Sequence, residues 1–266
     1  MTEVFKLRRG ATPLLISIPH DGRALAPGMA ERMTDIGRAL PDTDWHVRRL
    51  YEFASELGAG VIAANYSRYV VDLNRPANDT ALYPGQPVTG LCPLQTFAGD
   101  PIYAPGKSVT PAEQSNRIRQ YWRPYHDALA RELVQLVGQF GYALLWDAHS
   151  IPGEVPQLFD GTLPDLNIGT NGGASCSPAL EVAIADAAGQ SPYTSVVNGR
   201  FRGGYITRRY GRPAAGIHAV QLELSQRNYM DEMSRDYLPG RAGKLSNAIR
   251  SMLTTFTRTA ESAYSG

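Results

Sequence analysis

The stretch ALLWDAHS, residues 143–150, indicates the fold because an apolar run leads directly into acidic and histidine side chains. Four other runs have the same apolar character and are rich in residues that favour β-structure. The predicted strands are Leu14–Ile18, Val61–Ala64, Tyr69–Leu73, Ala143–Trp146 and Ala219–Leu224. Continuous apolar runs of this kind are typical of strands that are buried on both faces of a sheet.

Helices are predicted between several of these strands. Thr110, Pro111 and Glu113 form a capping box with proline at the first helical position, and Pro124 should kink the long helix that follows. Gly58 is placed to end an earlier helix. The predicted helices cover residues 47–57, 110–140, 177–188 and 240–260. Strands that alternate with helices predict an α/β fold whose mainly parallel or mixed sheet is covered on both faces.

Composition and charge exclude several classes of protein. The chain has 266 residues, with 26 Lys+Arg against 25 Asp+Glu, so its net charge of +1 provides no field for nucleic acid or an anionic membrane. Cys92 and Cys176 are too few for a disulfide framework, and no leader peptide or membrane span is recognisable. We therefore expect a soluble cytoplasmic protein with one domain, residues 1–266. Its long loops, Pro76–Val109 and Ile151–Cys176, are expected to be functional.

Polar side chains follow four of the predicted strands. His20 comes after the first, Asn74 and Arg75 after the third, His149 after the fourth, and Glu223 lies within the last. In open α/β sheets, ligands bind beyond the carboxyl ends of the strands. The sequence therefore predicts that these side chains converge on one site.

Two histidines at strand ends suit a catalytic zinc site, which takes about three nitrogen or oxygen ligands and leaves a position for water. His20 and His149 are the candidate nitrogen ligands, and the third ligand should be a carboxylate. The local choices are Asp21, Asp42, Asp44 and Asp147. Asp147 is better placed to orient His149, whereas Asp42 and Asp44 precede a predicted helix, where aspartate often acts only as a cap. The same donors also suit iron, cobalt or manganese.

Glu223 lies in the apolar run Val220–Leu224, where a buried carboxylate without a partner is costly. Such a carboxylate can serve as a general base toward a water at the metal, or can form a buried salt bridge with an arginine. Both interpretations are open at this point.

Arginines suggest an anionic substrate, because their rigid guanidinium binds carboxylates with two hydrogen bonds. Arg68 and Arg75 flank the predicted strand Tyr69–Leu73. The segment 198–213 contains five more, at Arg200, Arg202, Arg208, Arg209 and Arg212. Arginines in loops are commonly solvated, so Arg75 is the strongest of these candidates.

Six motifs occur together in a specific order. They are SIPHDG (17–22), DTDWHV (42–47), SRYVVDLNRP (67–76), WDAHSIPG (146–153), GGYITRRYG (203–211) and AVQLELSQRNYM (219–230). Over about residues 13–235 the chain resembles the N-formylglutamate amidohydrolase (deformylase) family. More distantly, it resembles the aspartoacylase and succinylglutamate desuccinylase group and the zinc carboxypeptidases.

This resemblance implies a three-layer αβα fold with a mixed, mostly parallel central sheet, of the zinc-exopeptidase or phosphorylase/hydrolase-like type. The implied activity is metal-dependent hydrolysis of N-formyl-L-glutamate to L-glutamate and formate, the last step of one route of histidine degradation. The implied cofactor is Zn²⁺, and the implied partner is a small dicarboxylate substrate. No nucleic-acid or membrane partner is expected.

The resemblance also implies roles for individual residues. The metal ligands would be His20, Asp44 and His149, and the base would be Glu223. The substrate-binding residues would be Asn74, Arg75, Arg68, Arg208 and Arg202. One departure affects the ligands: Asp21-Gly22-Arg23 follows His20, so the glutamate of the related HxxE motif is absent. Asp44 would replace it, with Asp42 as the alternative.

Two other functions remain open. A related zinc amidohydrolase or carboxypeptidase would act on other N-acyl amino acids or peptides and would differ only in the shape of its pocket. A non-catalytic module would bind a dicarboxylate without metal. A serine hydrolase is disfavoured because no GxSxG motif is present, and Gly106-Lys107-Ser108 lacks the upstream glycine of a phosphate-binding loop.

Overall fold

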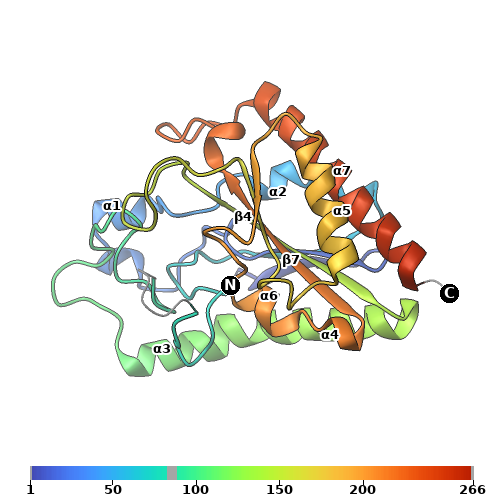
Figure 1. Ribbon diagram of the computed structural model, residues 1–266. Coiled ribbons are helices and arrows are strands. Elements are labelled where there is room, and N and C mark those ends of the chain that lie inside the picture. Colours follow the sequence, from blue (N-terminus) through green and yellow to red (C-terminus); the bar gives the residue numbers. More distant parts are fainter. Residues whose placement is uncertain (1, 83–88, 265–266) are drawn as a thin grey trace.

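The computed structural model describes residues 2–82 and 89–264, and its centre is a seven-stranded sheet of order β1-β3-β2-β4-β7-β5-β6 (Figure 1). β2, β3, β4 and β7 are parallel, while β1 runs antiparallel to β3 and β5 antiparallel to β7. The strands are β1 (Phe5–Arg8), β2 (Leu14–Ile18), β3 (Gly60–Ala64), β4 (Ala143–Ile151), β5 (Leu166–Gly169), β6 (Ser195–Val197) and β7 (Ile217–Ser225). The expected α/β fold with a mixed, mostly parallel sheet is confirmed.

Helices cover both faces of this sheet and give three layers (Figure 1). One apolar core lies between the sheet and helices α2, α5 and α7, and a second lies between the sheet and helices α4 and α6. The helices are α1 (Asp35–Arg38), α2 (Val47–Leu50), α3 (Pro111–Arg117), α4 (Arg123–Phe140), α5 (Pro178–Gly189), α6 (Tyr205–Tyr210) and α7 (Pro239–Tyr264). Among the described residues, no helix combines the length and apolarity that a membrane span requires.

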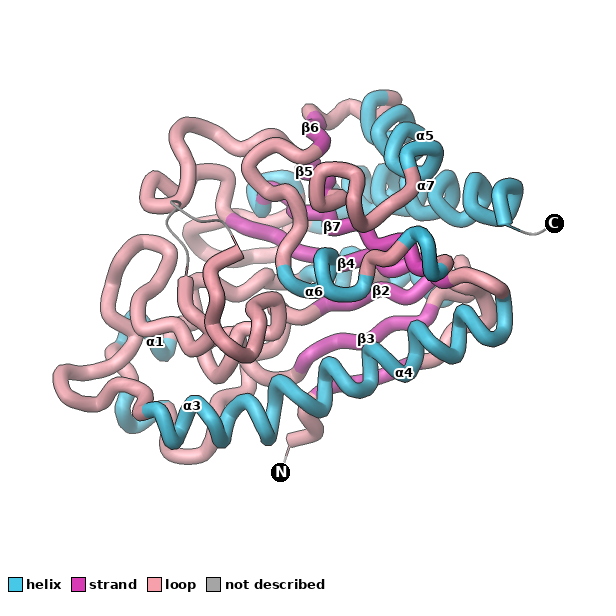
Figure 2. Tube along the Cα trace, turned by 60° about the horizontal axis from the view of Figure 1, so that its bottom comes forward, coloured by secondary structure: helices cyan, strands magenta, loops and turns pink. Residues whose placement is uncertain are grey.

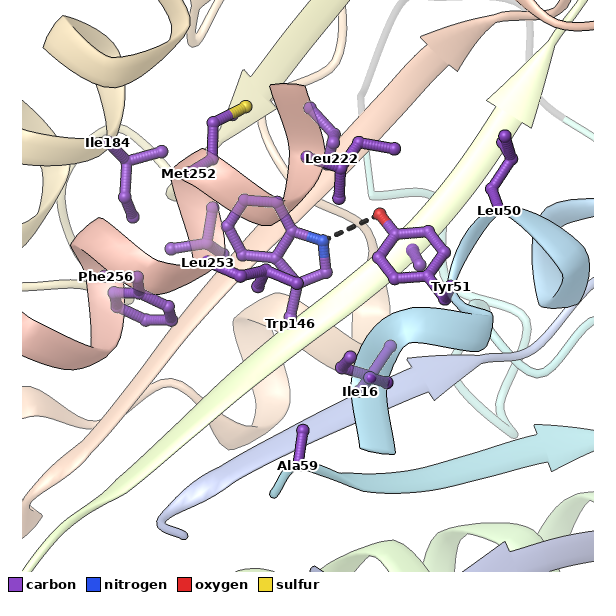
Figure 3. Packing of buried hydrophobic residues seen from close by; sticks show 14 of the residues in the cluster. Ile16, Leu50, Tyr51, Ala59, Trp146, Ile184, Leu222, Met252, Leu253 and Phe256 are labelled. Atoms are coloured by element: carbon purple, nitrogen blue, oxygen red, sulfur yellow. Dashed lines mark hydrogen bonds between the residues drawn. The ribbon is translucent and has the colours of Figure 1, made fainter. Parts of the chain in front are cut away.

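Successive side chains of β4 enter the two apolar cores in turn, which explains why the first half of this strand is apolar at every position. Trp146 points into the core beside α5 and α7, where its indole Nε1 donates a hydrogen bond to the Tyr51 hydroxyl at 2.9 Å (Figure 3). Leu145 points to the opposite core, against α4. Because side chains alternate between the faces, Asp147 and His149 follow Leu145 onto the α4 face. β4 continues through these polar residues to Ile151 and does not end at Trp146.

β7 has the same alternation, which places the polar ends of the two strands side by side. Ala219 belongs to the core beside α4, so Gln221 and Glu223 lie on that face too. In the pairing of β4 with β7, Asp147 lies opposite Gln221, and His149 lies opposite Glu223. The long loops gather at one end of the sheet (Figure 2).

The prediction of a strand at Tyr69–Leu73 is wrong. These residues are buried, but their backbone forms turns in which Val70 N donates to Ser67 O and Arg75 N donates to Asp72 O. Side chains of the same segment stabilise the turns, since Ser67 Oγ accepts from Tyr69 N and Asp72 Oδ1 accepts from Asn74 N. Such local bonds compete with strand pairing and override the β-propensity of the apolar residues.

The predicted helices differ from the observed ones in two places. The first predicted helix is reduced to α2 and a 3₁₀ turn, Glu52–Ser55. The long helix begins as predicted, with Thr110 Oγ1 accepting from Glu113 N, but a π-helical turn, Ile118–Trp122, separates α3 from α4. Pro124 has no N–H to donate, and this wider turn accommodates it. Of the predicted loop Pro76–Val109, residues 83–88 lie outside the described residues.

Candidate active site

Three buried side chains converge at the carboxyl ends of β2 and β4. His20 follows β2, His149 lies on β4, and Asp44 lies in the segment before α2. Two backbone bonds fix Asp44: its N–H donates to His20 O at 3.1 Å, and its Oδ2 accepts from Ser150 N at 3.1 Å. The three side chains could hold a metal ion, with one ligand atom from each lying within 4.8 Å of the others.

The distances between the donor atoms fit a small divalent ion. The two Nδ1 atoms of His20 and His149 are 3.2 Å apart, and Asp44 Oδ2 lies 3.3 Å from His149 Nδ1 and 3.8 Å from His20 Nδ1. Ligands at about 2.0–2.2 Å from a tetrahedral zinc ion lie about 3.3–3.5 Å from one another. Two imidazoles and one carboxylate are also the donors that such an ion takes in catalytic sites.

A further carboxylate contacts the outer nitrogen of each histidine. Asp72 Oδ1 lies 2.8 Å from His20 Nε2, and Asp147 Oδ2 lies 2.9 Å from His149 Nε2. Ser17 Oγ in turn donates to Asp147 Oδ1 at 3.0 Å. Carboxylates in this position help to orient histidine ligands, and both Nδ1 atoms face the centre of the group.

The position of Asp147 agrees with its expected orienting role, whereas sequence reasoning missed Asp72. A signal for Asp72 was present, because it is a carboxylate within an apolar run, which is the argument that singled out Glu223. Asp42, the alternative ligand, lies outside the group and accepts from Phe97 N at 2.9 Å. Asp21 pairs with Arg48, whose N–H it accepts at 3.1 Å. The geometry therefore favours Asp44 as the carboxylate of this group.

Electrostatics keeps the Asp44 carboxylate ionised. Burial alone would raise the pKa of Asp44, but its hydrogen bond with His149 and the nearby charges of His20 and Arg68 outweigh burial and lower that pKa. Burial also opposes a charge on His149, but Asp147 and Asp44 together raise its pKa well above the ordinary value. An ionised carboxylate is the form that binds a metal.

Glu223 lies beside this group, opposite His149 in the sheet. Its side chain is buried, and burial raises its pKa to about 8, although the charge of His149 opposes the shift. A carboxylate whose pKa lies near neutral pH is suited to take up and release a proton. Gln221 Nε2 donates to Glu223 Oε2 at 3.2 Å. Among the described residues, no arginine forms a salt bridge with Glu223; Arg68, for example, pairs with Asp72 and Asp44.

His149, His20 and Glu223 face a cavity of about 90 Å³. Cavities that bind drug-sized ligands are typically about 300–1,000 Å³, so this one suits a small molecule. The described part of its wall carries three arginines, two amides and several apolar side chains. The lining residues are His20, Arg68, Asp72, Asn74, Arg75, Leu82, Thr89, Phe97, His149, Ile151, Leu158, Arg200, Phe201, Gly204, Gln221 and Glu223.

Arg68 is held mainly by protein carboxylates. Its guanidinium lies 2.7 Å from Asp72 Oδ2 and 3.6 Å from Asp44 Oδ1, and its Cζ lies 4.8 Å from the centre of the Phe97 ring. Its positive charge therefore offsets the carboxylates around the histidines as well as facing the cavity.

The other arginines of the predicted site divide into two groups. Arg75 lines the cavity, with Nη2 3.4 Å from Thr89 Oγ1, and Arg200 lines it with its Nε bonded to Leu158 O at 2.9 Å. Arg202 and Arg208 are not among the described residues that form the wall, and Arg208 Nε donates to Gly203 O. Sequence reasoning could not rank the loop arginines, because a loop has no periodicity that shows which side chains point inward.

Asn74 joins this wall to the histidines. Its Oδ1 accepts from Ile206 N at 2.8 Å, and its Nδ2 lies 3.1 Å from His149 Nε2. The side chain is buried and lines the cavity. It therefore fixes the start of α6 against the histidine group, in addition to any contact with a ligand.

Substituting Asp72 should weaken metal binding without unfolding the protein. In Asp72→Asn, His20 loses the negative charge that orients its ring, and loss of such a partner typically lowers metal affinity about 10–100-fold. The measurement is a zinc dissociation constant from competition with a chelator. Asp21→Asn is the matched control, since Asp21 is also buried and next to His20 but pairs with Arg48. Equal affinities in both variants would show that Asp72 has no such role.

Comparison with known proteins assigns the chain to a family. Residues 12–230 match the family model described as N-formylglutamate amidohydrolase. The chain is 54% identical over 235 residues to the N-formylglutamate deformylase of Pseudomonas aeruginosa, covering 88% of each protein. It is 52% identical over 233 residues to that of Pseudomonas putida, covering 87% of each.

Solved structures share the fold. A crystal structure of N-formylglutamate amidohydrolase from Ralstonia eutropha has a TM-score of 0.81 and 27% identity, with 97% of each chain covered. A gene product from Agrobacterium tumefaciens has a TM-score of 0.70 at 18% identity, with 96% of each chain covered, which shows likeness of fold.

Proposed function

Because the chain belongs to the N-formylglutamate amidohydrolase family, we propose that it is a metal-dependent deformylase that hydrolyses N-formyl-L-glutamate to L-glutamate and formate. The observation that carries the proposal is the grouping of His20, Asp44 and His149 beside one small cavity, which His20, His149 and Glu223 line and which has arginines on its wall. This reaction needs metal ligands, a general base and cationic side chains that bind the carboxylates of the substrate.

His20, Asp44 and His149 would hold the metal, which we propose to be Zn²⁺. The spacing of their donor atoms supports this choice, although the same donors also bind iron, cobalt and manganese. When bound, zinc supplies the Lewis acidity that activates water and the formyl carbonyl. Asp72 and Asp147 would help to keep the two imidazole rings turned toward such an ion.

Glu223 would act as the general base and then as the general acid. Its carboxylate takes a proton from the attacking water, whose oxygen forms the new bond to the formyl carbon. The same proton then passes to the amine nitrogen of glutamate as the C–N bond breaks, which gives the free amine and formic acid. Formic acid then releases its remaining proton and leaves as formate. The burial of Glu223 beside His149 supports this role, because it keeps the carboxylate away from bulk water.

Arg75 and Arg200 would bind the two carboxylates of the substrate. Both line the cavity, one from the segment after the Asp72 turn and one from the segment before α6. A guanidinium at each end of a dicarboxylate would hold the formamide in one position, which converts binding energy into orientation. Arg68 would support Arg75, and we propose contact with substrate for Asn74 as well; roles for Arg202 and Arg208 remain predictions.

We further propose that the whole chain, residues 1–266, forms one catalytic domain, because the proposed site draws its residues from most of the length of the chain. A reducing compartment such as the cytoplasm suits the free, buried thiols of Cys92 and Cys176. The products would fit the last step of a histidine degradation route.

A panel of acylated glutamates tests the substrate. The small cavity should accept formyl and disfavour larger acyl groups, and one added methyl group typically changes kcat/KM about 10–200-fold. We expect N-formylglutamate to be cleaved at least about 10-fold more efficiently than N-acetylglutamate, with N-succinylglutamate slower still. The measurement is release of free glutamate from each compound. Faster cleavage of acetyl, succinyl or peptide substrates would indicate the related amidohydrolase or carboxypeptidase, and glutamate binding without turnover would indicate a binding module.

A further inference from the structure

A buried amide side chain lies next to the proposed base. Gln221 precedes Glu223 by two residues on β7, so the two side chains project from the same face of the sheet. Gln221 Nε2 lies 3.2 Å from Glu223 Oε2, and Gln221 Oε1 lies 2.7 Å from Gly204 N and 3.5 Å from Asn74 Nδ2. Gln221 is buried and lines the cavity, but none of the motifs assigned it a role.

The backbone fixes which end of this amide faces the base. Gly204 N–H is a donor, so the atom that it meets must be the carbonyl oxygen of Gln221. The opposite end, which faces Glu223 Oε2, is therefore the amide NH₂ group. Ile206 N–H fixes the orientation of Asn74 in the same way. Two backbone N–H groups before and within α6 thus hold both buried amides in a single orientation.

Close packing keeps the Gly203–Gly204 turn in place on the sheet. A Cβ atom at Gly204 would lie 2.2 Å from Asn74 Nδ2, and one at Gly169 would lie 2.5 Å from Gly203 N. Gly169 lies on β5 directly opposite Gln221. Only glycine fits at these two positions, so the turn rests against both the sheet and Asn74. The Gly204 N–H consequently has little freedom to release Gln221.

We propose that Gln221 is a positioning residue that orients the carboxylate of Glu223 for proton transfer. Its NH₂ group holds Oε2, and Oε1 is left to take the proton from water. Gln221 accepts a hydrogen bond from Gly204 N–H and donates one to Glu223. It therefore connects the proposed base to the turn that leads from Arg200 to α6. This inference rests on the proposed function of Glu223 as the base.

The consequence should appear in kcat more than in KM. Without the bond from Gln221, the Glu223 carboxylate can rotate, and it then points productively for a smaller fraction of the time. Misplacement of a catalytic group by about 1 Å can cost about 100-fold in rate, so we expect kcat to fall about 10–100-fold. Zinc content should not change, because the hydrogen bonds of the Gln221 side chain among the described residues go to Asn74, Gly204 and Glu223 and not to the three ligands.

Two substitutions separate this role from a purely structural one. Gln221→Glu has the same shape and keeps an oxygen for Gly204 N–H, but it replaces the donor to Glu223 by a second oxygen. An ionised Glu at 221 would repel Glu223, and a shared proton would occupy the base, so kcat should fall in either case and should change by a larger factor than KM. Gln221→Met removes both bonds, and we expect the fall in kcat to be accompanied by a higher KM because the turn is also released.

The matched control is Ser225→Ala on the same strand. Ser225 is buried, and its Oγ has no hydrogen-bond partner among the described residues. This variant should have the kcat and KM of the unsubstituted protein. The measurements are kcat and KM on N-formylglutamate, zinc content and the melting temperature for all four proteins.

The outcomes are distinguishable. A Gln221→Glu variant that folds, keeps its zinc and has an unchanged kcat would overturn the positioning role, and the proposed function would stand. Loss of zinc or a raised KM without a change in kcat would also overturn it and would assign Gln221 to the scaffold. If the unsubstituted protein cleaves another acylated amino acid instead, the same comparison is made on that substrate. If it cleaves none, the proposed function fails and the role of Gln221 fails with it.

Discussion

Glu223→Gln should lower kcat for N-formylglutamate by about 10²–10⁴-fold, the range that a positioned general base contributes. Glutamine keeps the size of the side chain and can still bond to Gln221, but it cannot take a proton from water. The zinc content should be unchanged, because the ligand group consists of His20, Asp44 and His149. Formate release and metal analysis on the same sample measure both quantities.

A carboxylate on the outer surface provides the control for this experiment. Glu56→Gln removes a charge that pairs with Arg250 at the surface, and the activity of this variant should match that of the unsubstituted protein. Turnover retained in Glu223→Gln would rule out Glu223 as the base. Loss of zinc in that variant would instead make Glu223 part of the metal site.

Arg75→Gln should lower kcat/KM on N-formylglutamate by about 100-fold or more. Removing one partner of a buried, hydrogen-bonded charge pair typically costs about 2–5 kcal/mol, and a substrate carboxylate would lose its guanidinium here. Most of the change should appear as a higher KM, with some loss of kcat because the formamide is less well oriented. Steady-state kinetics on N-formylglutamate measures the division between the two constants.

The arginines near α6 provide an internal comparison for Arg75. Arg200→Gln should resemble Arg75→Gln, since both arginines line the cavity, whereas Arg209→Gln removes an exposed charge and should have little effect. Arg202→Gln and Arg208→Gln test the assignments made from the motif, and the cavity wall predicts smaller effects than for Arg200. A normal KM in Arg75→Gln together with a raised KM in Arg202→Gln would contradict the proposed binding mode.

The sequence was sufficient to predict the strands that carry the chemistry. β2, β4 and β7 are buried on both faces, so each contains an apolar run. The polar residues His20, which follows β2, and Asp147 and Glu223, which lie within β4 and β7, are conspicuous beside these runs. Because β4 and β7 are parallel and in register, His149 and Glu223 meet directly. The general rule that sites lie at the carboxyl ends of parallel strands was then enough to bring them together.

The sequence was not sufficient where turns and loops decide the structure. The run Tyr69–Leu73 is as apolar as a strand, but Ser67 and Asp72 fold it into turns and direct Asp72 toward His20. Arg200 lines the cavity and Arg202 does not, and this difference depends on the path of an irregular loop. The role inferred for Gln221 depends on a backbone N–H from residue 204, a contact that no spacing rule could predict.

Metal analysis coupled to a formate-release assay tests the central claim most directly. We expect about one zinc ion per chain in active protein, loss of formate release after a chelator removes the metal, and recovery when zinc is restored. His149→Ala should neither retain the ion nor recover activity. Full release of formate from metal-free protein would contradict the account.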